Sequence, residues 1–389
     1  MKKYDYLIVG AGIIGMTIAY ELIHRNKDLS IAIIDKEEDV AKHASGRNSG
    51  VLHAGFYYSA DSLKAKFTVE GNRKMKQFCV EQNIFINDSK KIVVAKDEKE
   101  LEGLYELQRR AEVNGVNTSI IEEIDVKKID SNIKTYQKAL YSPTTASVDP
   151  KEVCFKLKEL LENKGIIFYF NKPFNKCNLE YEYLINSAGA YADKIAKGFG
   201  LAKNYTMLPF KGIYLKYMEN KSAIKTNIYP VPNLSNPFLG VHYTITVDGS
   251  IKIGPTAIPA FWRENYKGFD NFKFSEMLEI FYYASKLFIL NSFNFRDLAF
   301  SEMKNYNPKV FISKAKDMVY SIGSDFKPIP AGIRSQLLNT TTNELIQDFV
   351  VEHTLDSTHI LNAVSPAFTC SFAFAEYVVD EINKNIKGK

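Results

Sequence analysis

Three glycines near the start of the chain have the spacing that binds a nucleotide phosphate. Gly10, Gly12 and Gly15 form Gly-x-Gly-x-x-Gly between an apolar stretch and a helical pattern. Such glycines allow the tight turn, the approach of a pyrophosphate to the backbone, and close packing of helix on strand. Asp35 ends the next predicted strand, where a carboxylate accepts hydrogen bonds from ribose hydroxyls. The pattern predicts dinucleotide binding; the alternative is a βαβ turn that uses its glycines for sterics alone.

Two further segments fit the same ligand. Residues 42–50 are small, polar and glycine-bearing, so their backbone can run close to a bound molecule. Residues 183–198 repeat the order of strand, small-residue turn and helix, which is typical of a two-part FAD domain. A second Gly-x-Gly-x-x-Gly is absent from the sequence, which argues against a built-in NAD(P)H site. The predicted cofactor contacts are Gly10, Gly12, Ile13, Ile14, Gly15, Asp35, Lys36, Ser45, Arg47, Asn48, Ser49, Gly50, Ala188 and Gly189.

If the dinucleotide is a flavin that takes its electrons from the substrate itself, the chemistry needs a base that accepts a substrate proton and a cation that orients the substrate. Of the six histidines, His53 follows the small-residue loop and His242 lies on the polar face of a predicted hairpin. Either can act as a base, since an unperturbed histidine titrates near pH 6.5; the alternative is a hydrogen-bonded structural histidine. His24 falls in a helix, and His43, His353 and His359 fall in polar stretches that indicate no pocket.

Arg334 is the candidate cation. It follows the turn-rich segment 327–333, which fixes where its side chain points, and a guanidinium offers a carboxylate a two-point grip. The alternative is an arginine paired with one of the protein's own carboxylates.

Composition narrows the class of protein. The chain has 389 residues, 46% hydrophobic content and a net charge of +5, which does not suit a nucleic-acid binder. Its four cysteines have neither metal nor disulfide spacing, so no metal is expected. The glycine motif begins almost at Met1, leaving no expected signal peptide, and no apolar run reaches about 18 residues. We expect a cytoplasmic protein that is soluble or peripheral on the membrane.

The elements that position these residues alternate between strand and helix up to about residue 200, and strands dominate from 208 to 255. Within the hairpin, Val241, Tyr243 and Ile245 share one face, and the polar face meets solvent or a pocket. Residues 274–294 form a predicted helix dense in aromatic and aliphatic side chains, interpreted as packed against the sheet rather than lying on a membrane. A last helix is expected from about residue 365 to 383.

The chain resembles the L-2-hydroxyglutarate dehydrogenase/oxidase family, within the D-amino-acid-oxidase-like flavoprotein superfamily. The motifs that carry the resemblance run nearly end to end; they are 9–16, 48–55 with Tyr57 and Tyr58, 62–65, 70–73, 237–242, 248–250, 254–255 and 330–334. The family implies a non-covalent FAD, oxidation of an L-2-hydroxy acid to a 2-oxo acid, and transfer of electrons to a quinone or to oxygen. The implied substrate is L-2-hydroxyglutarate.

The resemblance also assigns residues. It implies that Arg334 binds the substrate carboxylate. It also places Tyr57 and Tyr58 at positions that face the substrate in related glycerol-3-phosphate dehydrogenases. Gly332, Thr369 and Ser371 join the cofactor contacts, the last two near the flavin pyrimidine edge at the start of the last helix. Lys211 stands where arginine is common and loses its planar clamp, so it is expected to hold a second carboxylate differently. Arg47 replaces a common histidine, and Ile213 replaces a usual acid.

The predicted fold is α/β, with a discontinuous Rossmann-like FAD-binding domain and a mainly antiparallel-sheet substrate domain. The FAD-binding domain is predicted over 1–75, 146–200 and 325–389, and the substrate domain over 76–145 and 201–324. Two other functions stay open: an amino-acid or sarcosine-type oxidase, and a non-catalytic FAD-binding interaction protein. The oligomeric state does not follow from the sequence.

Overall fold

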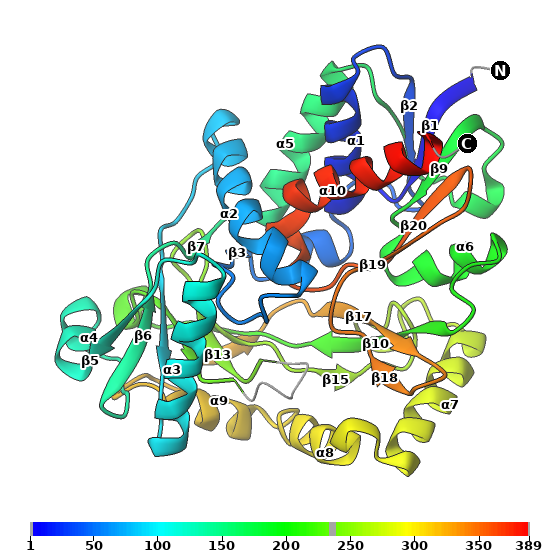
Figure 1. Cartoon of the computed structure of the whole chain (residues 1–389). Coiled ribbons are helices and arrows are strands. Elements are labelled where there is room, and N and C mark those ends of the chain that lie inside the picture. The colour runs from blue at the N-terminus through cyan, green and yellow to red at the C-terminus, as the bar shows by residue number, and fades with distance from the viewer. Residues whose placement is uncertain (1–2, 233–238, 388–389) are drawn as a thin grey trace.

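The computed structural model describes residues 3–232 and 239–387 (Figure 1). Pro237 and Phe238 of the family motif lie outside the described residues. The fold is α/β, as predicted, with one largely parallel sheet near the N-terminus and two antiparallel-rich sheets below it in Figure 1.

The first sheet has six strands in the order β19-β20-β9-β1-β2-β8. All of its pairings are parallel except that of β19 with β20. Both faces are apolar: Tyr6 and Ile8 of β1 enter one core cluster, and Leu7 and Val9 enter another. Its strands are β1 (Lys3–Val9), β2 (Ile31–Ile34), β8 (Ile167–Tyr169), β9 (Glu180–Asn186), β19 (Val350–His353) and β20 (Ser357–Asn362).

Helices cover both faces of this sheet, as a doubly apolar sheet requires. One core cluster joins the sheet to α1 (Ile13–Arg25), α2 (Leu63–Glu81), α5 (Pro150–Asn163) and α10 (Ala367–Lys387), which gather on one side in Figure 1. The opposite face packs against α6 (Ala192–Gly198). The helix predicted from residue 365 begins at Ala367 and is α10.

The second large sheet has eight strands in the order β16-β11-β14-β13-β12-β4-β6-β5. Helices α3 (Glu98–Val113), α4 (Glu123–Ile129) and α9 (Pro308–Lys316) contribute apolar side chains to its two core clusters. Its strands are β4 (Lys91–Val94), β5 (Ser119–Glu122), β6 (Lys138–Ser142), β11 (Leu215–Tyr217), β12 (Asn227–Pro230), β13 (His242–Ile245), β14 (Ile251–Gly254) and β16 (Phe326–Pro328).

A third sheet links the two halves. Its order is β15-β10-β17-β18, and the long antiparallel pairing of β10 (Tyr205–Gly212) with β17 (Gly332–Asn339) sets Phe210 opposite Arg334. The remaining strands are β15 (Ile258–Pro259), β18 (Glu344–Leu345) and the small pair β3 (Val51–Leu52) with β7 (Ala146–Ser147). Residues 326–345 were predicted within the FAD-binding segments. In the structure, β16 of this stretch pairs with β11 of the eight-stranded sheet, and β17 pairs with β10 of the third sheet.

The apolar segment 274–294 packs on the third sheet through one stripe and exposes the rest of its surface. It forms α7 (Phe274–Leu290), after which α8 (Phe295–Lys304) begins. Glu276, Ile280 and Leu287 are its buried residues, whereas large apolar side chains point to solvent. The prediction that this helix packs against a sheet is confirmed, because Ile280 and Leu287 share a core cluster with Leu208 and Phe210 of β10 and with Leu338 of β17. Only this narrow, partly polar stripe of the helix faces inward. No helix in the described part of the chain is long and apolar enough to cross a membrane.

Candidate active site

A cavity of about 1040 Å³ opens at the carboxyl ends of β1 and β2. This edge is where parallel α/β sheets bind ligands. Residues from the whole length of the chain line it, drawn from the segments 9–14, 34–53, 172–176, 187–199, 207–214, 255–273, 332–335 and 360–369. Of the predicted cofactor contacts, the ones that line this cavity are Gly10, Gly12, Ile13, Ile14, Asp35, Lys36, Ser45, Arg47, Asn48, Ser49, Ala188, Gly189, Gly332 and Thr369.

The glycine loop leaves room at the start of α1. Gly12 is the N-cap and gives the helix no side-chain cap, and the first turn holds no acid. The Ile13 N–H donates to the Ser45 hydroxyl at 3.0 Å. Gly10 has φ +105°, and a Cβ there would lie 2.5 Å from the Ser187 carbonyl oxygen. An uncapped helix N-terminus with bare backbone beside it suits a pyrophosphate.

Gly15 and Gly50 lie outside the cavity lining. A Cβ on Gly15 would lie 2.2 Å from the Gly10 carbonyl oxygen, so this glycine allows α1 to pack against the loop. Gly50 has φ +76°, and a Cβ there would lie 2.2 Å from the Val148 carbonyl oxygen. Both positions serve backbone packing in this structure.

Asp35 stands at the end of β2 with both carboxylate oxygens turned to the loops around the cavity. One oxygen accepts the Ala11 N–H at 2.8 Å, and the other accepts the Glu37 N–H at 2.9 Å. The carboxylate therefore has a fixed position beside the glycine loop. Together with the size of the cavity and the uncapped helix, it fits an extended dinucleotide such as FAD.

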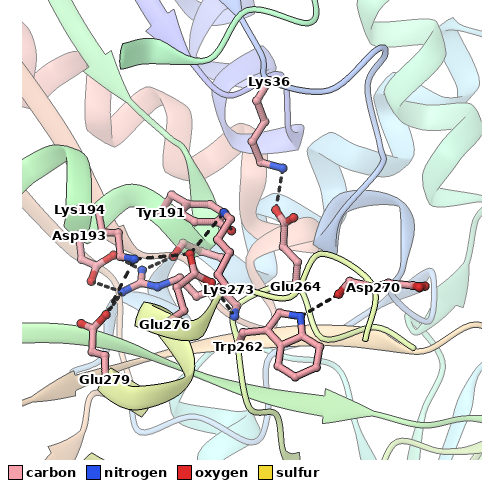
Figure 2. Close-up of polar contacts among 12 residues, drawn as sticks. Lys36, Tyr191, Asp193, Lys194, Trp262, Glu264, Asp270, Lys273, Glu276 and Glu279 are labelled. Atoms are coloured by element: carbon pink, nitrogen blue, oxygen red, sulfur yellow. Dashed lines mark hydrogen bonds and ion pairs between the residues drawn. The ribbon is translucent and has the colours of Figure 1, made fainter. Parts of the chain in front are cut away.

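A segment from the other half of the molecule closes one side of the cavity. Figure 2 shows Lys36, which follows β2, paired with Glu264; the Nζ–Oε1 distance is 2.6 Å. His43 donates to or accepts from the Tyr266 hydroxyl at 2.7 Å, and the Arg47 guanidinium lies 4.2 Å from the Tyr266 ring centroid. His43 therefore lies at the cavity, contrary to the sequence interpretation.

Glu37, His43 and Glu264 bring their ligand atoms within 4.8 Å of one another. Lys36 forms ion pairs with both glutamates, so a lysine already supplies the positive charge at this cluster. The sequence held no signal for Glu264 or Tyr266, because their contacts depend on how segment 262–266 folds back over β2.

A small recess of about 40 Å³ adjoins the large cavity and shares residues with it. His53, His242 and Arg334 all line the recess, although they come from three separate parts of the chain. The complete lining is Ser49, His53, Tyr214, Tyr229, Leu239, His242, Pro255, Thr256, Ala257, Arg334 and Ser365. The fold thus brings together the two predicted bases and the predicted cation.

The two histidines are held differently. The His242 ring stacks on Tyr229 with 3.8 Å between centroids, and its Nδ1–H donates to the Gly240 carbonyl at 2.8 Å. Burial holds the pKa of His242 at about 3. His53 is fixed through its backbone: its N–H donates to the Thr369 hydroxyl at 3.2 Å, and its carbonyl accepts from Asn72 at 3.0 Å.

Burial holds the pKa of His53 well below its ordinary value, and the charge of Arg334, together with that of Lys91 when Lys91 is protonated, adds to the effect. Both imidazoles are therefore neutral near pH 7, the protonation state that a proton acceptor needs. Burial also lowers the pKa of Arg334, an effect that Tyr214 opposes. A guanidinium nevertheless keeps its charge in proteins.

Besides Gly15 and Gly50, four predicted contacts lie outside the lining of both cavities. Tyr57 is buried against Phe56 and Tyr229, and Tyr58 lies beside Lys64. Lys211 points to Asn265, with 3.3 Å between Nζ and Oδ1, because neighbouring strand residues face opposite ways and Phe210 takes the cavity side. Ser371 is fully buried one turn into α10, and only Thr369 reaches the cavity.

The family profile described as FAD dependent oxidoreductase matches residues 5–380. The chain belongs to this family. FAD is accordingly its cofactor, and the cavity geometry agrees with it.

Similar proteins span nearly the whole chain. L-2-hydroxyglutarate dehydrogenase of Escherichia coli K12 is 33% identical over 97% of this chain and 93% of its own length. The mitochondrial L-2-hydroxyglutarate dehydrogenase of Homo sapiens is 33% identical over 99% and 90%. This similarity confirms the family resemblance drawn from the sequence motifs.

Solved structures share the fold at low identity. The reduced L-α-glycerophosphate oxidase of Mycoplasma pneumoniae, with FAD bound, has a TM-score of 0.76 at 21% identity and covers 98% of this chain and 95% of its own. Glycine oxidase of Geobacillus kaustophilus has a TM-score of 0.71 at 15% identity and covers 99% and 95%. The predicted fold class is confirmed.

Proposed function

We propose that this enzyme oxidises an L-2-hydroxy acid, with L-2-hydroxyglutarate the first candidate, to the 2-oxo acid. The observation that carries the proposal is the meeting of His53, His242 and Arg334 in a recess that opens into the cofactor cavity. Full-length similarity to L-2-hydroxyglutarate dehydrogenases supports this choice of substrate.

Each residue of the recess has a distinct task in this reaction. Arg334 binds the carboxylate next to the reacting carbon and orients the substrate. His53 accepts the hydroxyl proton. Bound FAD supplies the acceptor for the hydride that leaves the same carbon. The chain's own contribution is therefore orientation and proton transfer.

The test is anaerobic reduction of the purified yellow protein. L-2-Hydroxyglutarate is expected to bleach the flavin absorbance, while D-2-hydroxyglutarate and amino acids leave it unchanged. Bleaching by an amino acid but by no hydroxy acid would instead establish the amino-acid or sarcosine-type oxidase. An FAD-loaded protein that no substrate reduces would point to the non-catalytic alternative.

We further propose that the electrons pass to a membrane quinone, with the outward face of α7 and α8 resting on the lipid surface. Phe274, Leu278, Phe281, Tyr282 and Ile289 recur at helical spacing on that face and are 52–70% exposed. Three exposed basic residues belong to these two helices; they are Lys273 at the N-cap of α7 and Arg296 and Lys304 of α8. Aromatic side chains beside lysine and arginine favour an anionic lipid surface.

Flotation with anionic phospholipid vesicles tests this contact. The wild type is expected to float with the vesicles, and Phe281→Glu with Ile289→Glu is expected to abolish flotation while FAD stays bound. Val80→Glu is the matched control, because Val80 is 69% exposed on α2. Oxygen becomes the acceptor to consider if the wild type does not float and a soluble quinone analogue leaves its turnover in air unchanged.

A further inference from the structure

A lysine lies buried directly behind the candidate base. Lys91 begins β4 and is 0% exposed. Its Nζ lies 3.5 Å from Nδ1 of His53, whereas Lys91 lines neither cavity. His53 therefore stands between the recess and Lys91.

The surroundings of Lys91 are aromatic rather than acidic. Its Nζ lies 4.0 Å from the ring centroid of Tyr229, 5.2 Å from that of Tyr57 and 5.7 Å from that of Phe56. Among the described residues, no carboxylate contributes to the pKa of Lys91, which burial alone lowers. Buried lysines are rare without such a partner, and a buried ammonium is costly unless it is compensated.

This environment brings the amine close to the point where it loses its proton. Burial lowers the pKa of Lys91 to about 7, while the aromatic faces still accommodate an ammonium when it forms. The charged or titratable groups around the Lys91–His53 pair are Tyr229 of β12, His242 of β13, Arg334 of β17 and Tyr57. None of them is an acid that would hold Lys91 permanently protonated.

We propose that Lys91 is a positioning residue that receives the proton from the far side of His53. In the resting pair, the neutral amine of Lys91 accepts a hydrogen bond from Nδ1–H of His53, which leaves Nε2 unprotonated. This inference rests on the proposed function, since it takes His53 as the base for the substrate hydroxyl.

Each proton transferred in this step has a donor and an acceptor. The substrate O–H bond breaks and an N–H bond forms at Nε2 of His53; the Nδ1–H bond breaks and an N–H bond forms at Nζ of Lys91. One proton thus moves from the substrate to Lys91, which becomes an ammonium over the Tyr229 ring. The substrate carbon is oxidised, and its hydride reduces the FAD of the proposed function.

Kinetics of the FAD-loaded enzyme test the relay through two substitutions. Lys91→Met removes the proton acceptor and is expected to lower kcat about 10- to 100-fold with less than about a threefold change in KM. The wild-type kcat is expected to rise with pH through about 7, and this limb is expected to disappear in the variant. Lys91→Arg is expected to be equally defective, since arginine cannot lose its proton.

Lys90→Met is the matched control, because Lys90 is the exposed neighbour of Lys91; wild-type kinetics are expected. Rescue of kcat by Lys91→Arg would overturn the relay and show that a fixed positive charge is what matters. An unchanged kcat and pH profile in Lys91→Met would overturn it as well.

A second measurement does not depend on turnover. In the wild type labelled with ¹⁵N-histidine, the His53 ring is expected to carry its proton on Nδ1 above pH 8, and His53→Gln assigns the signal. A proton on Nε2 instead would overturn the proposal. If the wild type oxidises no hydroxy acid, the proposed function fails, whereas the ¹⁵N result still reports on the Lys91–His53 pair.

Discussion

Arg334 sets the orientation of the substrate at the scale of a single residue. A charged hydrogen bond in a partly closed site contributes about 1.5–3 kcal/mol, and the planar guanidinium adds direction. Arg334→Ala is therefore expected to lower kcat/KM about 10- to 100-fold or more, with Arg334→Lys in between, while the flavin spectrum persists. Both kcat and affinity for the substrate are expected to fall, because the reacting C–H bond is no longer oriented toward the flavin.

Lys211→Met provides the comparison for Arg334. Lys211 contacts Asn265 outside both cavities, so removal of its charge is expected to leave kcat/KM within about twofold. Near-normal kinetics in Arg334→Ala together with a large loss in Lys211→Met would make Lys211 the anchor of the substrate carboxylate.

The two histidines make separable contributions. His53→Gln is expected to abolish oxidation of hydroxy acids and to keep FAD bound, because it removes the proton acceptor. His242→Gln is expected to have the smaller effect, because Nδ1–H of His242 is committed to the Gly240 carbonyl and its ring is stacked on Tyr229. Stopped-flow flavin reduction measures both variants, and the reverse ranking would identify His242 as the base.

At the scale of elements, one buried ion pair ties α6 to the segment that closes the cofactor cavity. Arg263 is 1% exposed and contacts both carboxylate oxygens of Asp193, which is fully buried. Asp193→Ala leaves a buried guanidinium without its main partner, so a loss of about 3–5 kcal/mol in the free energy of unfolding is expected.

Denaturant unfolding of the holoenzyme measures this loss. Glu182→Ala is the control, because the exposed Lys3–Glu182 pair joins two side chains that are more than half exposed and contributes about 1 kcal/mol or less. Equal effects of the two substitutions would show that the Arg263–Asp193 pair does not hold the segment in place.

At the scale of the whole molecule, local patterns were sufficient for the cofactor half of the site. The order of strand, glycines, helix and acid lies within residues 4–35, and the conformation of each of these elements follows from its own residues. The packing of α7 on a sheet was predicted from its apolar content. The stripe that faces inward was not, because a helix with apolar residues around most of its surface does not reveal it. Lys91 was missed because its burial depends on Tyr229, which reaches it only through the pairing of β12 with β4.

FAD is expected to stabilise both halves of the molecule together, since the cavity is lined by the first sheet, by β17 and by the start of α10. Free FAD at about 100 times its Kd adds about 2.7 kcal/mol to the free energy of unfolding. Gly12 has an unstrained backbone, and a Cβ there meets only the Ser45 hydroxyl, at 3.1 Å. Apo Gly12→Ala is therefore expected to unfold like the apo wild type and to lose the FAD-dependent rise in Tm, since the added methyl group blocks the pyrophosphate. If apo Gly12→Ala were itself destabilised by several kcal/mol, the glycine would serve chain sterics alone; a full rise in Tm with FAD would place the phosphates elsewhere.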